Sequence, residues 1–336
     1  MFPVTDPAGR QAVSEWRSRV QAEARTTLGS SVRLVAGGYA DTLVSDRREP
    51  SGRRISSFGH VRPLDIYAEA RSRVVEVRAG MSRIVWGRLD EFQPTDVINP
   101  LDLSRFILEG RSEARLSVPM LRTRWFLPRS STLEVVVTPT FRAGTFDETR
   151  ERTSPFNLGP TGVPMTRATP STEWHPRRIP GGARFSTTSG RVDWSLTTFR
   201  GHRSFPIYQA NGIVPGVTET YPEFTMVGAD FETARGPWGV RGEVAGFVKD
   251  TLQSDVLGRG VGGHTWQGGI GVDRKTGAYR VAGDVIVSST RVDGSNPSSV
   301  AALKVDPNIQ RDSVTLVASA DRSFVRDTRN VKFFAA

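Results

Sequence analysis

Three carboxylates recur at a spacing of six residues in one stretch of the chain. Asp90, Asp96 and Asp102 are separated by Pro94 and Pro100, which interrupt regular structure. Carboxylate oxygens are ligands that Ca²⁺ prefers, although this spacing is not that of an EF-hand. We weigh three hypotheses: a loop that folds inward and narrows a pore, a Ca²⁺ site, and a structural loop whose Asp and Asn side chains cap turns. We favour the inward loop and expect no metal.

Charges of both signs also gather on one face of several segments. Residues 15–28 carry them at alternate positions, and so do Glu76 and Arg78 in a later segment. In a water-filled lumen such charges tune ion selectivity. The alternative is a lattice of cross-strand salt bridges in a polar interior. The residues that we expect to line or constrict a pore are Arg17, Arg19, Glu23, Glu76, Arg78, Asp90, Asp96 and Asp102.

Catalytic signals are weak. The four histidines, His60, His175, His202 and His264, fall in or beside long loops. A hydrolytic site there would need paired carboxylates and a histidine within reach, and neither G-x-S-x-G nor H-E-x-x-H occurs. The absence of cysteine excludes disulfides and Cys-ligated metals. We expect no catalytic residues and no cofactor.

The segments that position these side chains alternate with a period of two. In residues 64–71, Leu64, Ile66 and Ala68 alternate with polar neighbours, which is typical of strands. No run of 18 apolar residues exists. The alternation predicts about fourteen strands. Eight of them cover residues 15–28, 32–43, 64–71, 75–86, a segment that begins near 114, 132–142, 314–321 and 331–336. The other six form three pairs, one on either side of each of the turns at 189–190, 235–237 and 273–277.

Short and long connections alternate along the chain, which is the pattern of outer-membrane barrels. The sequence therefore predicts an all-β fold, an antiparallel transmembrane β-barrel that forms a single domain over residues 1–336. Strand counting predicts one further strand at each end and sixteen in all. A large soluble β-protein is the alternative, but the second strand face is charged and no second set of core residues is evident. We expect an interfacial aromatic belt of Trp16, Trp125, Phe126, Tyr221, Trp238 and Trp266.

The formal net charge is +10. A nucleic-acid partner would account for it, but no compact nucleic-acid module is present. We expect the arginines to serve a lumen and a surface facing anionic lipid instead. The expected partners are outer-membrane lipid and lipopolysaccharide, a small solute and a second copy of the chain, and the expected location is the cell outer membrane.

Residues 80–120 resemble a family of Gram-negative outer-membrane barrel proteins of unknown function. That family combines G-R-Q-x-x-x-W-G with an acidic N-P-x-D loop and E-x-x-L-P-V-P-M. The matching residues here are Gly80, Trp86-Gly87, Asp90, Asn99 to Asp102, Glu113 and Ser117 to Met120. Met81-Ser82 replace the Arg-Gln of the pattern. The resemblance implies an outer-membrane barrel and says almost nothing about a substrate.

These observations together predict an outer-membrane, porin-like channel for passive passage of small solutes through a charged lumen. Two other hypotheses remain open. One is an outer-membrane enzyme with its site at the extracellular rim, and the other is a plugged barrel with a structural role.

Overall fold

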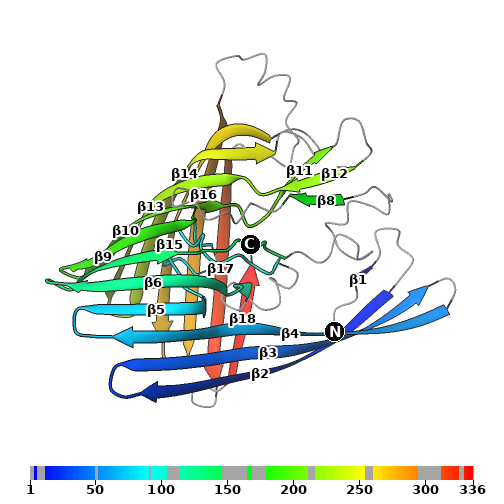
Figure 1. The fold of residues 1–336 in the computed structure, drawn as a ribbon, viewed down its shortest axis with the longest axis horizontal. Coiled ribbons are helices and arrows are strands. Elements are labelled where there is room, and N and C mark those ends of the chain that lie inside the picture. Colours follow the sequence, from blue (N-terminus) through cyan, green and yellow to red (C-terminus); the bar gives the residue numbers. More distant parts are fainter. Residues whose placement is uncertain are drawn as a thin grey trace.

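The computed structural model describes residues 4–5, 12–49, 52–90, 92–103, 114–145, 165–168, 179–210, 216–253, 260–293, 312–324 and 329–335. One antiparallel sheet of fifteen strands dominates the fold, with sequence neighbours paired almost throughout (Figure 1). Its strands are β1 (Val4–Thr5), β2 (Ala12–Leu28), β3 (Val32–Glu49), β4 (Gly52–Arg71), β5 (Val75–Ser82), β6 (Val118–Leu127), β7 (Ser131–Val137), β9 (Gly181–Ser189), β10 (Val192–His202), β13 (Glu223–Arg235), β14 (Trp238–Gln253), β15 (Gly260–Thr276), β16 (Tyr279–Val292), β17 (Asp312–Phe324) and β18 (Arg329–Ala335).

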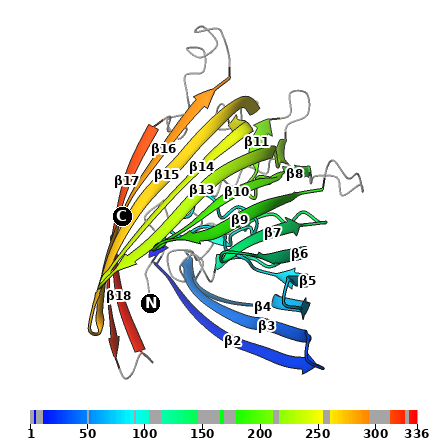
Figure 2. The same cartoon turned by 90° about the vertical axis from the view of Figure 1, so that its left-hand side faces the viewer.

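The sheet curls around an interior, with β2 and β18 on either side of the gap between its ends (Figure 2). Within the described part of the chain, no pairing joins the two edge strands, β1 and β18. A second sheet of three short strands, β8 (Met165–Ala168), β11 (Ile207–Ala210) and β12 (Val217–Thr220), lies at the long-loop end. Fourteen strands of the large sheet exceed two residues, so the prediction of about fourteen antiparallel strands is confirmed.

Along the strands, apolar side chains lie on the outer surface and charged side chains face the interior, which is the reverse of the distribution in a soluble protein. On β16, Val281, Val285 and Val287 are exposed on the outer surface, whereas Asp284 between them is buried in the interior. The same contrast holds on β13, where Val227 is exposed and Asp230 is 3% exposed. An apolar outer surface around a charged interior is the arrangement that a lipid environment requires of a barrel.

The structure corrects three details of the predicted strands. The predicted strands 32–43 and 64–71 leave residues 45–61 as a connection between them, but β3 and β4 pair through this region as far as Glu49 and Gly52. The fifth predicted strand begins at Val118 rather than Ala114. Of the expected aromatic belt, Trp16, Trp125, Trp238 and Trp266 are exposed, whereas Tyr221 is only 4% exposed and Phe126 is partly buried.

No helix among the described residues is long and apolar enough to cross a membrane.

Candidate functional site

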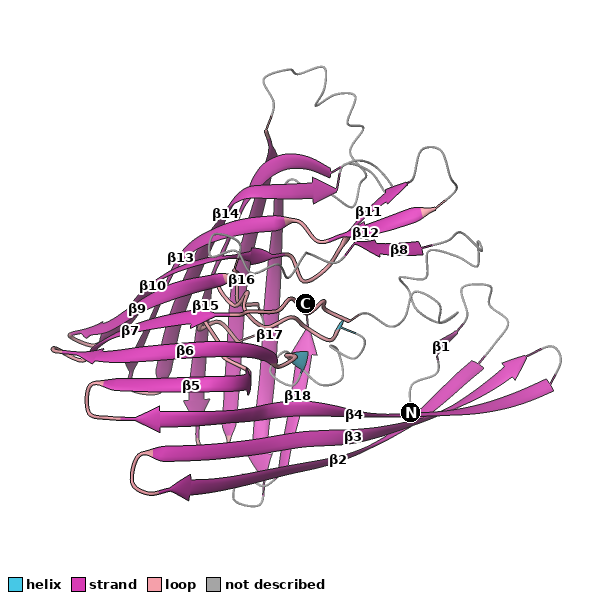
Figure 3. Cartoon of the chain, in the orientation of Figure 1, coloured by secondary structure: helices cyan, strands magenta, loops and turns pink. Residues whose placement is uncertain are grey.

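The connection between β5 and β6 folds into the interior of the curled sheet (Figure 3). We call its described residues, 83–90, 92–103 and 114–117, the inner loop. Asn99 joins the two ends of this loop: its amide nitrogen donates to the carbonyls of Ser82 (3.1 Å) and Leu116 (2.9 Å). Its side-chain oxygen accepts from the backbone N–H of Ile84 at 2.9 Å. One buried amide thus closes the base of the loop.

An apolar cluster lies beneath the inner loop, inside the barrel. Trp86 is 1% exposed, and its indole meets Phe199 edge-on with ring centroids 6.4 Å apart. The indole N–H donates to Glu134 at 2.6 Å. The cluster comprises Ile84, Trp86 and Ile98 of the loop and Val118, Met120, Val136, Phe199, Phe224, Met226, Ala245 and Phe247 of the wall. The loop is therefore packed against the wall as firmly as a core element.

This cluster overturns one expectation from the sequence. A second set of core residues does exist, because the barrel interior holds one under the inner loop. The predicted fifth strand contributes to it: Val118 and Met120 are each 3% exposed and face inward, while Leu121 and Trp125 lie on the outer surface.

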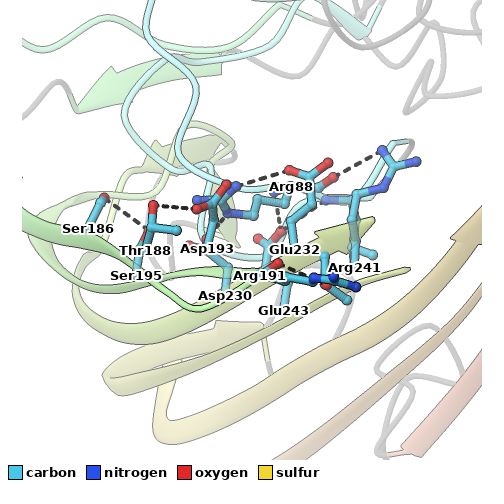
Figure 4. Close-up of polar contacts among 12 residues, drawn as sticks. Arg88, Ser186, Thr188, Arg191, Asp193, Ser195, Asp230, Glu232, Arg241 and Glu243 are labelled. Atoms are coloured by element: carbon cyan, nitrogen blue, oxygen red, sulfur yellow. Dashed lines mark hydrogen bonds and ion pairs between the residues drawn. The ribbon is translucent and has the colours of Figure 1, made fainter. Parts of the chain in front are cut away.

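Glu243 of β14 holds the far end of the inner loop. Its carboxylate accepts the backbone N–H groups of Thr95 (2.6 Å), Arg88 (2.9 Å) and Leu89 (3.4 Å), and the Thr95 hydroxyl at 2.7 Å. Glu243 is buried, with 5% of its surface exposed. Four donors converge on one buried acid, so the loop crosses the interior from β5 and β6 and is anchored on β14 (Figure 4).

Arg88 extends this contact to β13. Its guanidinium donates to Asp230 at 2.6 Å and to Glu232 at 3.0 Å (Figure 4). Burial opposes the charge on Arg88, but the hydrogen bonds and negative charges of Asp230 and Glu232 outweigh it and raise the pKa of this arginine. Arg184 of β9 also donates to Asp230, at 2.9 Å. A single buried carboxylate therefore serves one arginine of the loop and one of the wall.

The three evenly spaced aspartates do not converge on a common point. Asp90 is held by Arg241 (2.5 Å) and Arg280 (2.7 Å) of the opposite wall. Asp96 accepts from Arg115 at 2.7 Å. Asp102 pairs with Arg62 of β4. Within the described residues no group of three or more His, Asp or Glu side chains is arranged to hold a metal ion, so the geometry gives the Ca²⁺ hypothesis no support.

Four of the five predicted lumen residues on strands have described side chains, and these face inward with an oppositely charged partner within 4.0 Å. Arg19 donates to Asp41 at 2.7 Å and lies over the ring of Tyr39. Arg78 donates to Glu69 at 2.6 Å. The structure thus shows the lattice of cross-strand ion pairs that the sequence left open as an alternative. Glu23 pairs with Arg25, Glu76 has Arg71, Arg122 and Arg124 within 3.8–4.0 Å, and the side chain of Arg17 lies outside the described ones.

Two glycines have backbone conformations and close neighbours that exclude a side chain. Gly80 of β5 has φ +136°, and a Cβ there would lie 2.3 Å from the carbonyl oxygen of Ile66 on β4. Gly87 of the loop has φ +138°, and a Cβ would lie 3.0 Å from the carboxylate of Glu243 and 2.9 Å from the Gln93 side chain. Neither backbone conformation suits a residue with a side chain. Gly80 thus allows close pairing within the wall, and Gly87 allows the loop to approach Glu243.

Several residues of this site were missed from the sequence. Glu134 lies on the inward face predicted for its strand, so alternation could have found it. Glu243 also alternates with outward Val244 and Gly242, but its partner Thr95 is 148 residues away along the chain. Arg88 is a loop residue for which no periodic signal exists, whereas Arg115 falls within the predicted fifth strand but lies in the loop before it.

The two histidines with described side chains lie apart from each other, and each contacts a single carboxylate. His202 has Glu223 at 3.9 Å and the carbonyl of Tyr221 at 3.1 Å. His264 has Asp293 at 3.3 Å. His175 and the side chain of His60 lie outside the described residues.

A curled antiparallel sheet with an apolar outer surface, a charged interior and a loop anchored across that interior is a transmembrane β-barrel. The fold class predicted from the sequence is thus confirmed. Residues 20–318 match the family described as "Protein of unknown function (DUF1302)", and the chain belongs to that family.

Solved structures with a similar fold include outer-membrane proteins and porins. A loop L8 deletion mutant of OmpT, an outer membrane protein of Vibrio cholerae, is 10% identical, with a TM-score of 0.44 over 94% of this chain and 90% of that one. The anion-selective porin from Comamonas acidovorans is 10% identical, with a TM-score of 0.43 over 97% and 89%. OccK7 of Pseudomonas aeruginosa is 11% identical, with a TM-score of 0.44 over 94% and 73%. A search of curated protein sequences finds no match.

Proposed function

We propose that this protein is an outer-membrane, porin-like channel for the passive passage of small solutes. The observation that carries the proposal is the combination of an apolar outer wall with a charged interior that the inner loop crosses. Such a loop reduces the cross-section of a barrel and brings charged groups close to any solute within it. The porin-like fold is consistent with this role.

A path for solutes would run between the inner loop and the inner faces of β2 and β3. The loop packs on the opposite wall, where its apolar cluster and Glu243 lie. On β2 and β3, in contrast, inward-facing charges keep access to solvent: the side chains of Glu23 and Arg33 are 28% and 53% exposed. Charges of both signs along this route would favour small polar or ionic solutes.

The location and partners that we propose follow from the outer surface. Exposed Trp125 and Trp238 lie close to short turns, and Trp16 and Trp266 lie towards the other end of their strands. Aromatic rings at both ends of an apolar belt are suited to the two membrane interfaces. We propose that outer-membrane lipid and lipopolysaccharide cover this belt, and that copies of the chain associate in the membrane.

Two other functions make different predictions. A plugged, structural barrel is favoured by the packing of Trp86 and its neighbours inside the barrel. An enzyme at the extracellular rim would need a histidine flanked by converging carboxylates. Among the described residues, His202 pairs with the carboxylate of Glu223 and His264 with that of Asp293, and we propose no catalytic role for them.

Single-channel recording in a planar bilayer tests the proposal. The full chain is folded in detergent, its strand content is checked by circular dichroism, and it is then inserted. We expect discrete conductance steps, and the reversal potential in a salt gradient gives the ion selectivity. Folded, inserted protein that produces no steps would refute the open channel and favour the plugged barrel.

A further inference from the structure

A cavity of about 290 Å³ opens into the interior beside the start of the inner loop. It lies against β6, β7 and β9, towards the short turns of the barrel. Four arginines line it, together with Glu134 and several apolar or hydroxyl side chains: Arg83, Arg122, Arg124, Arg184, Ile84, Val85, Trp86, Phe126, Thr132 and Ser186. We call it the arginine cavity. Its volume is close to the lower end of the range for small-molecule sites.

Guanidinium groups outnumber carboxylates in the wall of this cavity. Glu134 accepts from Arg122 (2.8 Å), Arg124 (2.9 Å) and the Trp86 indole (2.6 Å). Two arginines thus share one carboxylate, and the next acid, Glu76, is 3.9–4.0 Å from them, beyond hydrogen-bond reach. A guanidinium has five N–H donors, and an oxyanion can accept two of them side by side. The wall therefore offers more donors than its own acids accept.

Arg83 adds a second, independent observation. Its terminal nitrogen donates to Asp65 at 2.9 Å, while its Nε is buried and has no hydrogen-bond partner among the described residues. A buried donor without an acceptor costs free energy, and such groups are rare in folded proteins. The guanidinium of Arg83 therefore keeps one donor that no acceptor among the described residues uses.

The apolar side chains of the cavity indicate that a ligand would have an apolar part as well as an oxyanion. Ile84, Val85 and Phe126 give the cavity an apolar side, and Val85 is 49% exposed. Exposed apolar groups beside a cluster of cations fit a ligand with an oxyanion at one end and a short apolar body at the other.

We propose that the arginine cavity binds a small organic carboxylate, with its head on Arg83 and Arg124 and its body against Phe126. This assigns the substrate class of the channel and so rests on the proposed function, but binding itself can be measured without conduction. A carboxylate held here would sit in the interior, against the start of the inner loop and the inner faces of β6, β7 and β9.

Isothermal titration of the full chain in detergent with sodium benzoate tests the proposal. We expect saturable binding to the wild type and none of the neutral analogue benzamide. Arg124→Gln should weaken benzoate binding at least about tenfold, the effect of losing one charge-assisted hydrogen bond. Glu134 keeps Arg122 and Trp86 in this variant, so the wall stays paired. Arg200→Gln on β10 is the matched control, because Arg200 is exposed, pairs with exposed Glu223 and lies outside both the cavity and the proposed solute path, and it should bind as the wild type does.

Several results would overturn the proposal. They are no binding of benzoate, equal binding of benzamide, equal effects of the two substitutions, and binding of inorganic phosphate that is tighter than that of benzoate. Single-channel recording separates this proposal from the function. Conduction without benzoate binding refutes the carboxylate site alone. Arg124-dependent binding by a protein that does not conduct refutes the channel and leaves the site in place.

Discussion

The carboxylate of Glu243 is the anchor on which the far end of the inner loop depends, and Glu243→Gln tests this directly. The glutamine keeps the size of the side chain but replaces one oxygen with an NH₂ group. One oxygen of Glu243 accepts both donors of Thr95, and the other accepts the N–H groups of Arg88 and Leu89. With the amide nitrogen towards Arg88 and Leu89, both of their N–H groups lose an acceptor. With the nitrogen towards Thr95, the N–H of Thr95 loses its acceptor, while the Thr95 hydroxyl can donate to the carbonyl of Trp86 instead. In either orientation at least one buried backbone N–H faces a donor.

The size of the effect follows from those contacts. Hydrogen bonds to a charged group contribute about 1.5–3 kcal/mol each, and such terms do not add fully. We therefore expect the attachment of the loop tip to weaken by about 2–4 kcal/mol. The strand pairing of β14 is made by backbone groups and should persist. The change would thus appear as local opening of the loop rather than as unfolding of the barrel.

Hydrogen exchange with mass spectrometry measures this opening. Protection of the amides of residues 88–95 should fall by roughly 30- to 1,000-fold, which is 2–4 kcal/mol expressed as an equilibrium constant. Amides of β13 and β14 should keep their protection. Glu223→Gln is the matched control, because that exposed carboxylate pairs with Arg200 on the neighbouring strand. Unchanged protection of residues 88–95 in Glu243→Gln would refute the anchoring role.

Three further predictions test the packing and the charges of the loop. Trp86→Ala should cost about 3–5 kcal/mol of loop or barrel stability, since the indole is fully buried, whereas Trp16→Ala, at a side chain 72% exposed, should cost much less in denaturant titrations. Gly80→Ala should lower the midpoint of unfolding because its Cβ would overlap a strand carbonyl, whereas Gly283→Ala, whose nearest neighbour would lie 3.9 Å away, should not. Asp90→Asn should shift the reversal potential of the channel towards anion selectivity, since two arginines lose a shared negative partner; an unchanged potential would place Asp90 off the ion path.

Alternation was enough to predict the strands of the wall. On β13 and β16 the outward valines and inward aspartates follow the simple rule, because lipid covers one face and polar groups the other. The same rule fails at Val118 and Met120. These side chains face inward but are apolar because they pack under the loop, so their sequence pattern is the same as that of an outward face. The rule also missed the ends of β3 and β4 around residues 45–61, where polar residues occur at successive positions and the two strand faces do not differ in polarity.

The inner loop could be foreseen in outline only. Its acidic residues and prolines indicated an irregular, functional segment, but the sequence carries no sign of which arginine each aspartate meets. Asp90 finds Arg241 and Arg280, which are 151 and 190 residues further along the chain. Such pairs are set by the curling of the whole sheet, so they emerge only from the three-dimensional arrangement.

Three residues hold the inner loop in place. Gly87 permits close approach to Glu243, Asn99 closes the base, and Trp86 fills the apolar cluster. Gly80 acts in the wall instead, where it lets β5 lie close to β4.

In the proposed channel, selectivity among solutes would depend on local imbalance between positive and negative groups rather than on the net charge of +10. Ion pairs such as Arg78 with Glu69 and Arg19 with Asp41 cancel much of the interior charge. Paired charges close together produce a weak field at a distance, and salt screens it further. A solute in the interior would respond chiefly to groups whose donors outnumber their acceptors. Around Glu134 the arginine cavity has that imbalance, which is why selectivity for anions should be sought there before it is sought in the bulk charge.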